Sequence, residues 1–401
     1  SNAFLQRGGD TVVMERLFAE LAKKGVSVDI DLQGAKDPSD YDLVHLFNFA
    51  TPEITRRLAE RCVVAKTPYV VTTLYEDLPV FYHQMIAHSN ALRTYVARGQ
   101  ERKSWDALAE EARRVPPAAR WENSWTAKHA AGLLATGEHE AALILKDYPD
   151  SGNVQLCRLG CELDAASADP ELFRREFGVS DFVLCVGRLE TRKNQLMLLK
   201  ALEDSDLTVV LASGGFTYQP EYEEACRNFK RKGKTLIVGR LDERMLASAY
   251  AASRVHVLPS FYEIPGLVSL EAARFGKNVV VTDRGTTRDY FGSAAVYCQP
   301  EDPKSILNSV VEAFYAVPKR ELRERVESFT WARSATETVA AYQHALGAVS
   351  FQPAASSASR STADSRIPHV VAGIEQARVE ALKASNSVGQ VSRALAADPE
   401  K

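Results

Sequence analysis

The chain has 401 residues, of which 45 % are hydrophobic and 25 % are charged, and its formal net charge is −3. This composition excludes a largely disordered chain, a collagen and a small disulfide-stapled protein, and the charge balance does not favour a nucleic-acid binder. The length is enough for two or three domains. No stretch approaches the roughly 18 apolar residues of a membrane-spanning helix, and no secretory leader opens the sequence, so we expect a cytoplasmic protein.

In chain order, an opening segment with Gly8 and Gly9 leads into a helical pattern that Gly25 ends. Short apolar runs follow, each bounded by turn residues, and helical stretches separate most of them. Strands that alternate with helices indicate βαβ units and a parallel sheet. The predicted strands of this first series are Val26–Ile30, Leu43–Phe47, Tyr69–Thr72 and Val154–Leu156.

A second alternating series begins near residue 181, beyond the polar stretch Asp164–Pro170. We therefore predict an α/β protein of two Rossmann-like, doubly wound domains that face each other across a cleft. In such sheets ligands bind beyond the carboxyl ends of the strands. The predicted strands of the second series are Phe182–Val186, Leu207–Leu211, Thr235–Val238, Val255–Leu258, Asn278–Val281 and Ala295–Tyr297.

The chain divides into four predicted units. Residues 354–365, AASSASRSTADS, are too rich in Ala and Ser to bury a core and are typical of a linker. The weakly amphipathic stretch from Val371 to Leu395 behind them leaves three readings open: a partner-binding tail helix, the start of a further domain, or a solvated tail. The units are an N-terminal domain (1–165), a C-terminal domain (166–332), a terminal helix that packs back toward the N-terminal domain (333–350), and this tail (351–401).

The cysteines lack the CxxC spacing of a zinc site. Two of them are four residues apart, but no second Cys or His pair lies near them in the sequence. We therefore expect no metal site and predict reduced, mostly buried thiols at all six positions, which are Cys62, Cys157, Cys161, Cys185, Cys226 and Cys298.

The sharpest chemical signal lies where a predicted strand gives way to a helix near Gly266. A helix start leaves N–H groups without intrahelical partners and carries the positive end of the helix dipole. The N–H groups of Gly266, Leu267 and Val268 therefore predict a phosphate site. Two carboxylates flank it, Glu263 in the loop and Glu271 about one turn into the helix, and carboxylates accept hydrogen bonds well from sugar hydroxyls.

Two further signals are weaker when each is taken alone. Arg188 and Lys193 follow the carboxyl end of the strand Phe182–Val186, where together they would neutralise a diphosphate, although a basic loop is often only a solvated loop. The adjacent glycines Gly8 and Gly9 stand before a helix, where they would let the backbone approach a phosphate closely, although such a pair is often only a turn.

Together these motifs resemble the large group 1 (family four) of retaining glycosyltransferases, which have the two-domain GT-B fold. The resemblance covers roughly residues 5–348, and its pieces fall in the family order. They are Gly8-Gly9, Asp42–His45, Asn123-Ser124, Val186–Leu189 with Lys193, Val238-Gly239 with Asp242-Glu243, Leu258–Ser260, Glu263 with Glu271, Asp283–Gly285 and Phe329–Trp331.

The resemblance implies transfer of a sugar from a UDP- or GDP-linked donor to a glycan or lipid-linked acceptor in polysaccharide or glycoconjugate assembly. It implies a retained anomeric configuration, no metal and no bound cofactor, with the acceptor on the N-terminal domain. It assigns Arg188 and Lys193 to the donor diphosphate, Glu263 to the donor sugar and Glu271 to the ribose. It also implies that Gly8 and Gly9 close over the phosphates and that Gly214, Gly215, Arg240 and Leu241 line the nucleotide pocket.

The sequence departs from the family pattern after the strand Tyr69–Thr72. Many members carry a Thr-x-His string there, and the histidine helps to hold the donor sugar. Leu74 stands at that position, so one of residues 75–77 is expected to replace the histidine. Members also open with a buried strand just before the Gly-Gly loop, whereas only a few residues precede Gly8, so this chain is expected to begin inside or after that strand.

Two other functions stay open. One is a GT-B enzyme with different chemistry, such as a nucleotide-sugar epimerase or a phosphorylase. The other is an inactive glycosyltransferase-like subunit, which the missing histidine favours and the retained basic and acidic motifs disfavour. The basic stretch from Arg93 to Arg120 predicts either a solvated helix face or a peripheral contact at the inner face of the plasma membrane. His45 is either a core histidine or a residue of the cleft.

Overall fold

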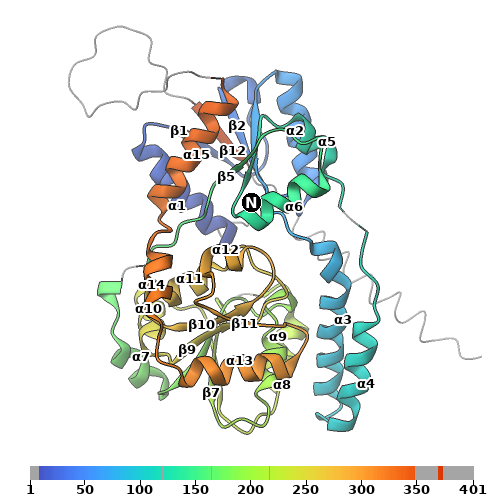
Figure 1. Ribbon diagram of the computed structural model, residues 1–401, viewed down its shortest axis with the longest axis vertical. Coiled ribbons are helices and arrows are strands. Elements are labelled where there is room, and N and C mark those ends of the chain that lie inside the picture. Colours follow the sequence, from blue (N-terminus) through green and yellow to red (C-terminus); the bar gives the residue numbers. More distant parts are fainter. Residues whose placement is uncertain (1–8, 120, 164, 216, 348–368, 374–401) are drawn as a thin grey trace, which may run out of the picture.

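The computed structural model describes residues 9–119, 121–163, 165–215, 217–347 and 369–373. Figure 1 shows two lobes, one above the other, and each is built around a parallel sheet. The predicted α/β class is therefore confirmed. Gly8 lies outside the described residues, whereas Gly9 is exposed and begins the first helix.

The sheet of the N-terminal lobe has the strand order β1-β12-β2-β3-β4-β5. Successive residues of a strand face opposite sides, so β2, which is buried along its whole length, contributes to two cores. Helices α1 (Gly9–Lys23) and α15 (Trp331–Ala345) cover one side, and α2 (Pro52–Ala65), α5 (Ser124–His129) and α6 (Glu138–Asp147) cover the other. The strands are β1 (Ser27–Asp31), β2 (Leu43–Phe47), β3 (Tyr69–Thr72), β4 (Gly132–Ala135), β5 (Val154–Leu156) and β12 (His369–Gly373).

The sheet of the C-terminal lobe has the order β11-β10-β9-β6-β7-β8. All of its strand pairs are parallel, and the central strands β6 and β9 are buried along their whole length. The strands are β6 (Phe182–Val186), β7 (Thr208–Ala212), β8 (Thr235–Val238), β9 (Val255–Leu258), β10 (Asn278–Thr282) and β11 (Val296–Cys298). The helices are α7 (Pro170–Phe177), α8 (Gln195–Ala201), α9 (Pro220–Asn228), α10 (Glu243–Ala252), α11 (Leu267–Arg274), α12 (Thr287–Phe291), α13 (Pro303–Tyr315) and α14 (Arg320–Glu327).

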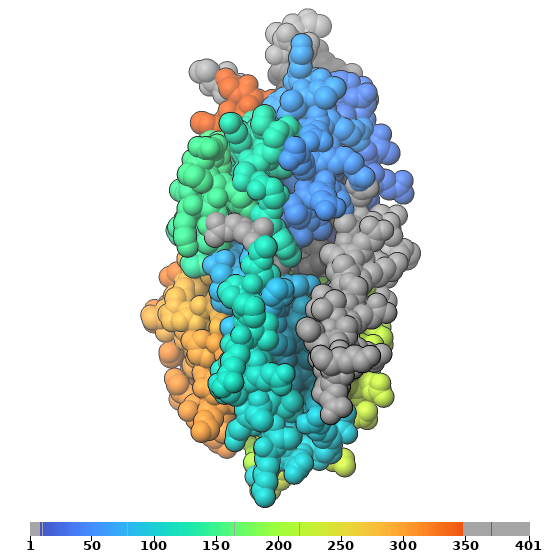
Figure 2. All heavy atoms as spheres, turned by 90° about the vertical axis from the view of Figure 1, so that its right-hand side faces the viewer, coloured from blue at the N-terminus to red at the C-terminus, as the bar shows by residue number. Residues whose placement is uncertain are grey.

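A helical hairpin from the N-terminal half packs on the C-terminal lobe. It consists of α3 (Leu78–Ala97) and α4 (Arg102–Arg113), which run down the side of the lower lobe in Figures 1 and 2. Tyr95 and Trp105 are buried in the same core as α8 and α9. Two basic residues of the hairpin form ion pairs with that lobe: Arg93 with Glu221, and Arg102 with Asp204.

The tail differs from its expectation. Residues 369–373 form strand β12, which lies between β1 and β2 in the N-terminal sheet. Of the three readings left open for the stretch that begins at Val371, the tail helix is therefore wrong for residues 371–373, where a strand forms and β-branched residues favour it. Residues 348–368 and 374–401, including the predicted linker, lie outside the described residues.

The six cysteines are all buried and form no disulfide, as the sequence predicts. His45 is a core histidine: its Nδ1 lies 2.7 Å from the Tyr342 hydroxyl and its Nε2 lies 2.7 Å from the Thr72 hydroxyl. Burial lowers the pKa of His45 to about 3, so its ring is neutral. Among the described helices, none combines the length and the apolar character that crossing a bilayer requires.

Candidate active site

Two loops that carry candidate residues leave the carboxyl ends of the neighbouring strands β6 and β9. The first turns at Gly187, whose φ of +149° suits glycine, and continues through Arg188 to a short 3-10 helix, Thr191–Lys193. Asn194, at φ +61°, then ties the loops together. Its amide donates hydrogen bonds to the carbonyl oxygens of Pro259, at 3.0 Å, and Pro300, at 2.7 Å.

Lys193 and Glu263 meet between these loops. The Lys193 Nζ lies 2.6 Å from the Glu263 Oε1, and the two side chains are 14 % and 2 % exposed. Burial by itself raises the pKa of Glu263, but Lys193 and Arg192 outweigh it and hold the pKa of that carboxyl below its ordinary value. Glu263 is therefore ionised at neutral pH, and its charge is compensated within the site.

The Glu263 carboxylate lies at the start of α11. Gly266 precedes the helix at φ +86°, and a Cβ at that position would come within 3.4 Å of the Glu263 Oε2. The amides of Ser269 and Leu270 donate the first hydrogen bonds back to the Gly266 carbonyl. The N–H groups before them, those of Leu267 and Val268, therefore have the outward direction that the predicted anion site needs.

The backbone of Glu263 is also fixed. It forms a short parallel bridge to Gly285, and the Thr286 amide donates to the Glu263 carbonyl at 3.0 Å. Gly285 has a φ of +77°, and a Cβ there would lie 2.0 Å from that carbonyl oxygen. Only glycine tolerates this close contact with the Glu263 backbone. The segment Asp283–Gly285 therefore positions Glu263.

Glu271 lies in a different environment. The Tyr250 hydroxyl donates to its Oε2 at 2.7 Å, and no salt bridge to it is found among the described residues. Burial raises the pKa of Glu271 to about 7. The two predicted carboxylates therefore differ in charge state near neutral pH, because only Glu263 faces a cation at contact distance.

The predicted nucleotide-pocket residues come together beside Arg188. A Cβ at Gly214 would lie 4.0 Å from the Arg188 Cγ, and one at Gly215 would lie 3.2 Å from the Arg240 Cβ. Arg188 itself lies over the Tyr218 ring, with its Nε 3.3 Å from the Glu190 Oε2. Leu241 follows Arg240 and packs at the edge of the neighbouring core.

The N-terminal lobe reaches the same region through α1 and contacts the C-terminal lobe at α10 and at the start of α11. Arg16 of α1 pairs with Glu243 of α10 at 3.0 Å. Leu267 packs against the N-terminal core that contains the apolar residues of α1, and Leu74 packs against the same core. The first turn of α11 therefore faces the N-terminal lobe, although Gly9 has no described contact with it.

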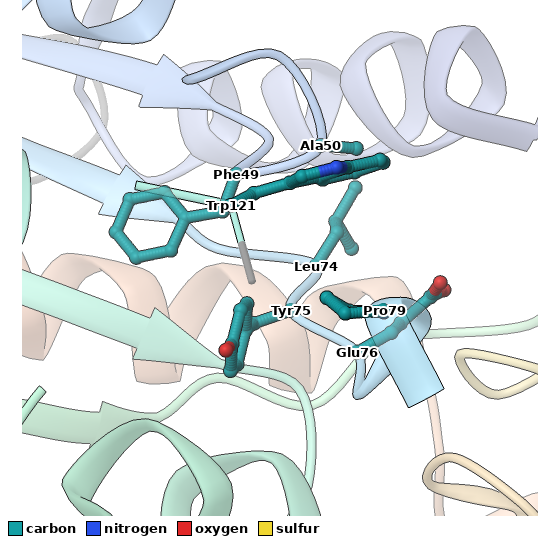
Figure 3. A pocket seen from close by; sticks show the side chains of 7 residues that line it. All are labelled: Phe49, Ala50, Leu74, Tyr75, Glu76, Pro79 and Trp121. Atoms are coloured by element: carbon teal, nitrogen blue, oxygen red, sulfur yellow. The ribbon is translucent and has the colours of Figure 1, made fainter. Parts of the chain in front are cut away.

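The loop after β3 is held by a residue that the sequence analysis missed. Glu140 is fully buried and accepts hydrogen bonds from the Thr73 hydroxyl and from the amides of Tyr75 and Thr136. These bonds hold Leu74 at φ +43°. Figure 3 shows Leu74 pointing toward Trp121 and Ala50 across a pocket, whereas Tyr75 points to the other side.

Arg192 is a second residue that the sequence analysis did not single out. Its guanidinium nitrogens lie 3.9 Å from carboxylate oxygens of Glu76, Glu190 and Glu263, and the group lies 5.1 Å from the centroid of the Tyr262 ring. Glu76 belongs to the N-terminal lobe, so Arg192 connects the two lobes electrostatically. Its only signal in the sequence was its position beside Lys193.

No group of three or more His, Cys, Asp or Glu residues within the described ranges is arranged to hold a metal ion. The cations nearest to Glu263 are instead supplied by the chain itself, as Lys193 and Arg192.

Comparison with known proteins confirms the family resemblance. The family model of group 1 glycosyl transferases matches residues 173–328, a range that contains Arg188, Lys193, Glu263 and Glu271. Sucrose-phosphate synthase from Thermosynechococcus elongatus is similar in structure, with a TM-score of 0.63 at 18 % identity over 85 % of this chain and 94 % of that one. This similarity confirms the predicted GT-B fold.

Two curated relatives are glycosyltransferases by name. The chain is 30 % identical over 189 residues to an uncharacterized glycosyltransferase of Methanocaldococcus jannaschii. The aligned segment covers 43 % of this chain and 48 % of that protein. It is 26 % identical over 229 residues to the O-antigen chain mannosyltransferase B of Escherichia coli. That aligned segment covers 53 % of this chain and 60 % of that protein. The chain thus spans about half the length of the first relative and three fifths of the second.

Proposed function

We propose that this chain, whose residues 173–328 are those of a group 1 glycosyl transferase, moves a sugar from a nucleoside-diphosphate sugar to a glycan or lipid-linked acceptor with retention of the anomeric configuration. The observation that carries the proposal is the Lys193–Glu263 ion pair, formed at the carboxyl ends of two central strands and beside the start of α11. Parallel sheets bind their ligands at this edge. The donor nucleotide is UDP or GDP.

The proposed chemistry depends on stabilising the leaving group. As the bond between the anomeric carbon and the diphosphate breaks, negative charge grows on the phosphate oxygens and positive charge on the sugar ring. Arg188, Lys193 and the N–H groups at the start of α11 are suited to the first charge, so no divalent cation is required. The Glu263 carboxylate is suited to the second, because it is ionised and held in place at its backbone.

Donor binding tests the first half of the proposal. We expect UDP, GDP or one of their hexose derivatives to raise the melting temperature of the protein, since a ligand at 100 times its Kd stabilises by about 2.7 kcal/mol. The double variant Arg188→Ala/Lys193→Ala should lose the shift. The variant Arg227→Ala removes a cation that is paired on the exposed face of α9, so it should keep the shift. If no nucleotide stabilises the protein, the proposal is wrong.

Product analysis tests the second half. Leu74 in place of the family histidine favours an inactive, donor-binding subunit, so binding alone is not sufficient evidence. A transferase forms nucleoside diphosphate and a glycosylated product only when a glycan or lipid-linked acceptor is present. An epimerase changes the sugar nucleotide without an acceptor. Donor binding with neither reaction across an acceptor panel would identify the binding subunit instead.

A further inference from the structure

Tyr290 of α12 belongs to the core of the C-terminal lobe, but its hydroxyl bonds to the N-terminal lobe. The hydroxyl accepts a hydrogen bond from the Leu159 amide at 2.7 Å and donates one to the Thr136 carbonyl at 2.8 Å. Thr136 and Leu159 follow the adjacent strands β4 and β5, so this contact lies at the carboxyl edge of the N-terminal sheet. Because Tyr290 is fully buried, loss of its hydroxyl would leave both backbone groups without a partner.

The Tyr290 ring lies where the chain crosses between the lobes. The chain leaves the N-terminal sheet after β5 and returns between α14 and α15. The Cys161 amide of the first crossing donates to the Phe329 carbonyl of the second at 3.0 Å, and the centroids of the Tyr290 and Phe329 rings are 4.6 Å apart. Tyr290 therefore contacts both crossings, one through its hydroxyl and one through its ring.

Asp289, one residue earlier, caps a helix of the other lobe. Its Oδ2 accepts a hydrogen bond at 2.9 Å from the amide of His139, the second residue of α6. Gly137 precedes α6, and a Cβ there would collide with the Asp289 carboxylate. Helix starts are usually capped by the residue just before them, so α6 receives from the C-terminal lobe the cap that its own glycine lacks. Figure 1 shows α12 at the top of the lower lobe, beneath the N-terminal lobe.

Helix α12 is fixed to Glu263 within its own lobe. The Asp289 amide donates to the Thr286 carbonyl, and the Thr286 amide donates to the Glu263 carbonyl, each at 3.0 Å. Arg325 of α14 donates to the carbonyls of Asp289, at 2.9 Å, and Tyr290, at 2.8 Å. A displacement of α12 would therefore move the backbone of Glu263 with it.

On the N-terminal side, Thr136 continues the connection to the loop after β3. Its amide and its hydroxyl donate to the Glu140 Oε2 at 2.7 Å and 2.6 Å, and the Glu140 Oε1 accepts from the Tyr75 amide at 2.7 Å. The loop after β3 and the Glu263 backbone are thus joined by hydrogen bonds and short backbone segments that pass through Tyr290.

We propose that Tyr290 and Asp289 are positioning residues of the transfer reaction, which fix the Glu263 carboxylate relative to the N-terminal lobe. The inference rests on the proposed function, because it concerns the alignment of that same site. A carboxylate that stabilises positive charge on a sugar ring acts only from a fixed place. Donor affinity is assigned to Arg188 and Lys193, on a different loop. Loss of the Tyr290 hydroxyl should therefore lower kcat and leave the donor KM nearly unchanged.

Kinetics of the full chain test the alignment. Tyr290→Phe should lower kcat about 10-fold or more, with a donor KM within about 2-fold of the parent value. Tyr69→Phe is the matched control, because the buried Tyr69 hydroxyl donates to the Thr126 carbonyl at 2.8 Å within the N-terminal lobe. This control should keep its kcat. An unchanged kcat in Tyr290→Phe, or an equal fall in both variants, overturns the proposal.

Asp289 is only half-buried, so its variants should fold even if Tyr290→Phe does not. Asp289→Ala removes the cap of α6 and should lower kcat, again with little change in the donor KM. Asp289→Asn keeps an oxygen that accepts the His139 amide, and Asn caps helices about as well as Asp, so it should restore most of the activity. Equal losses in the two variants would overturn the role of the cap.

Hydrogen–deuterium exchange tests the connection without activity and so separates it from the proposed function. In Tyr290→Phe, the amides of residues 73–76 and 284–289 should exchange about 5-fold faster or more, since each segment loses a fixed neighbour. The strand β7 should exchange as in the parent protein. Faster exchange in both segments supports the connection even if no sugar is transferred, and faster exchange in one or neither overturns it.

Discussion

The Lys193 Nζ lies 2.6 Å from the Glu263 Oε1, so two loops that follow different strands are joined by a nearly buried ion pair. The motif resemblance assigns one of these residues to the donor diphosphate and the other to the donor sugar. Their contact explains how both can be kept charged although their side chains are nearly buried. It also means that either residue, if removed alone, leaves the other buried without its main partner.

Removing both partners of this pair should therefore cost less than the sum of the two single removals. We expect Lys193→Met to lower the free energy of unfolding by about 3 kcal/mol, because it leaves the Glu263 carboxylate facing only the more distant Arg192. The double variant Lys193→Met/Glu263→Gln should lose less than the sum of the single changes, with a coupling of about 1–3 kcal/mol. Urea denaturation of the parent protein, the two single variants and the double variant measures this coupling as a double-mutant cycle.

The exposed pair Arg323–Glu327, with nitrogen and oxygen 2.9 Å apart on α14, provides a matched control. Its coupling in the same cycle should stay below about 0.5 kcal/mol. Equal couplings at the two sites would contradict the prediction.

The Lys193–Glu263 pair should also make stability depend on pH. The pKa of Glu263 is held below its ordinary 4.5, so the contribution of Glu263 to stability is complete above pH 4.5. This contribution is lost as the pH falls through the lower pKa of the folded state. Glu263→Gln should lack this acid loss.

Glu271 should show the opposite pH dependence. Burial raises its pKa to about 7 from an ordinary 4.5, so the folded state holds this proton more tightly than the unfolded state. Its contribution to stability is complete below pH 4.5 and declines until the pH has passed about 7, with a slope of at most about 1.4 kcal/mol per pH unit. Denaturation midpoints measured from pH 5 to 8 should show the decline in the parent protein and not in Glu271→Gln. A parallel decline in both would exclude Glu271 as its source.

Catalysis should survive removal of divalent cations. In the proposed site, Arg188, Lys193 and the start of α11 supply the positive charge that faces the diphosphate, so a metal has no remaining role. We expect sugar transfer in excess EDTA to match that in Mg²⁺, within the error of the assay. Activity that is abolished by EDTA and restored by Mg²⁺ or Mn²⁺ would refute the metal-free reading while leaving the fold assignment intact.

The sequence predicted those parts of the molecule that local patterns determine. Arg188 and Glu263 each follow a short apolar strand, and adjacent strands of a parallel sheet bring their carboxyl ends together. Glu140 could not be found in this way. It is one acid in a helix with several charged residues, and its role depends on the loop after β3, which is distant in the sequence. Arg192 escaped notice because a basic residue beside a motif is usually solvated.

Long-range pairing explains the two larger differences. The basic stretch from Arg93 to Arg120 predicted a solvated helix face or a membrane contact, but nothing in its pattern indicated that Tyr95 and Trp105 pack on the C-terminal core. Likewise, His369–Gly373 is a short apolar segment inside a polar tail, and its partners are the strands β1 and β2 near the opposite end of the chain. A five-residue strand carries too little periodicity to indicate where it pairs.

The last prediction concerns the different roles of the two carboxylates. Glu263 is ionised and lies beside the proposed reaction centre, so its charge should matter most as the sugar ring becomes positive. We expect Glu263→Gln to lower kcat by about 100-fold or more. Glu271 is farther along α11 and is assigned to the ribose, a contact that is similar in the ground and transition states, so Glu271→Gln should raise KM and leave kcat nearly unchanged.

Steady-state kinetics with the donor identified by thermal shift can separate these roles, and the environments of the two groups make the comparison informative. Each substitution keeps the shape of the side chain, but only Glu263→Gln removes a charge that Lys193 compensates. Glu271→Gln removes a carboxyl that already accepts a hydrogen bond from Tyr250. Tyr250→Phe is therefore the matched control for the second site, and it should change KM in the same direction as Glu271→Gln and by less. If Glu271→Gln alone abolished turnover, the division of roles would be wrong, because a ribose contact cannot account for a loss confined to the chemical step.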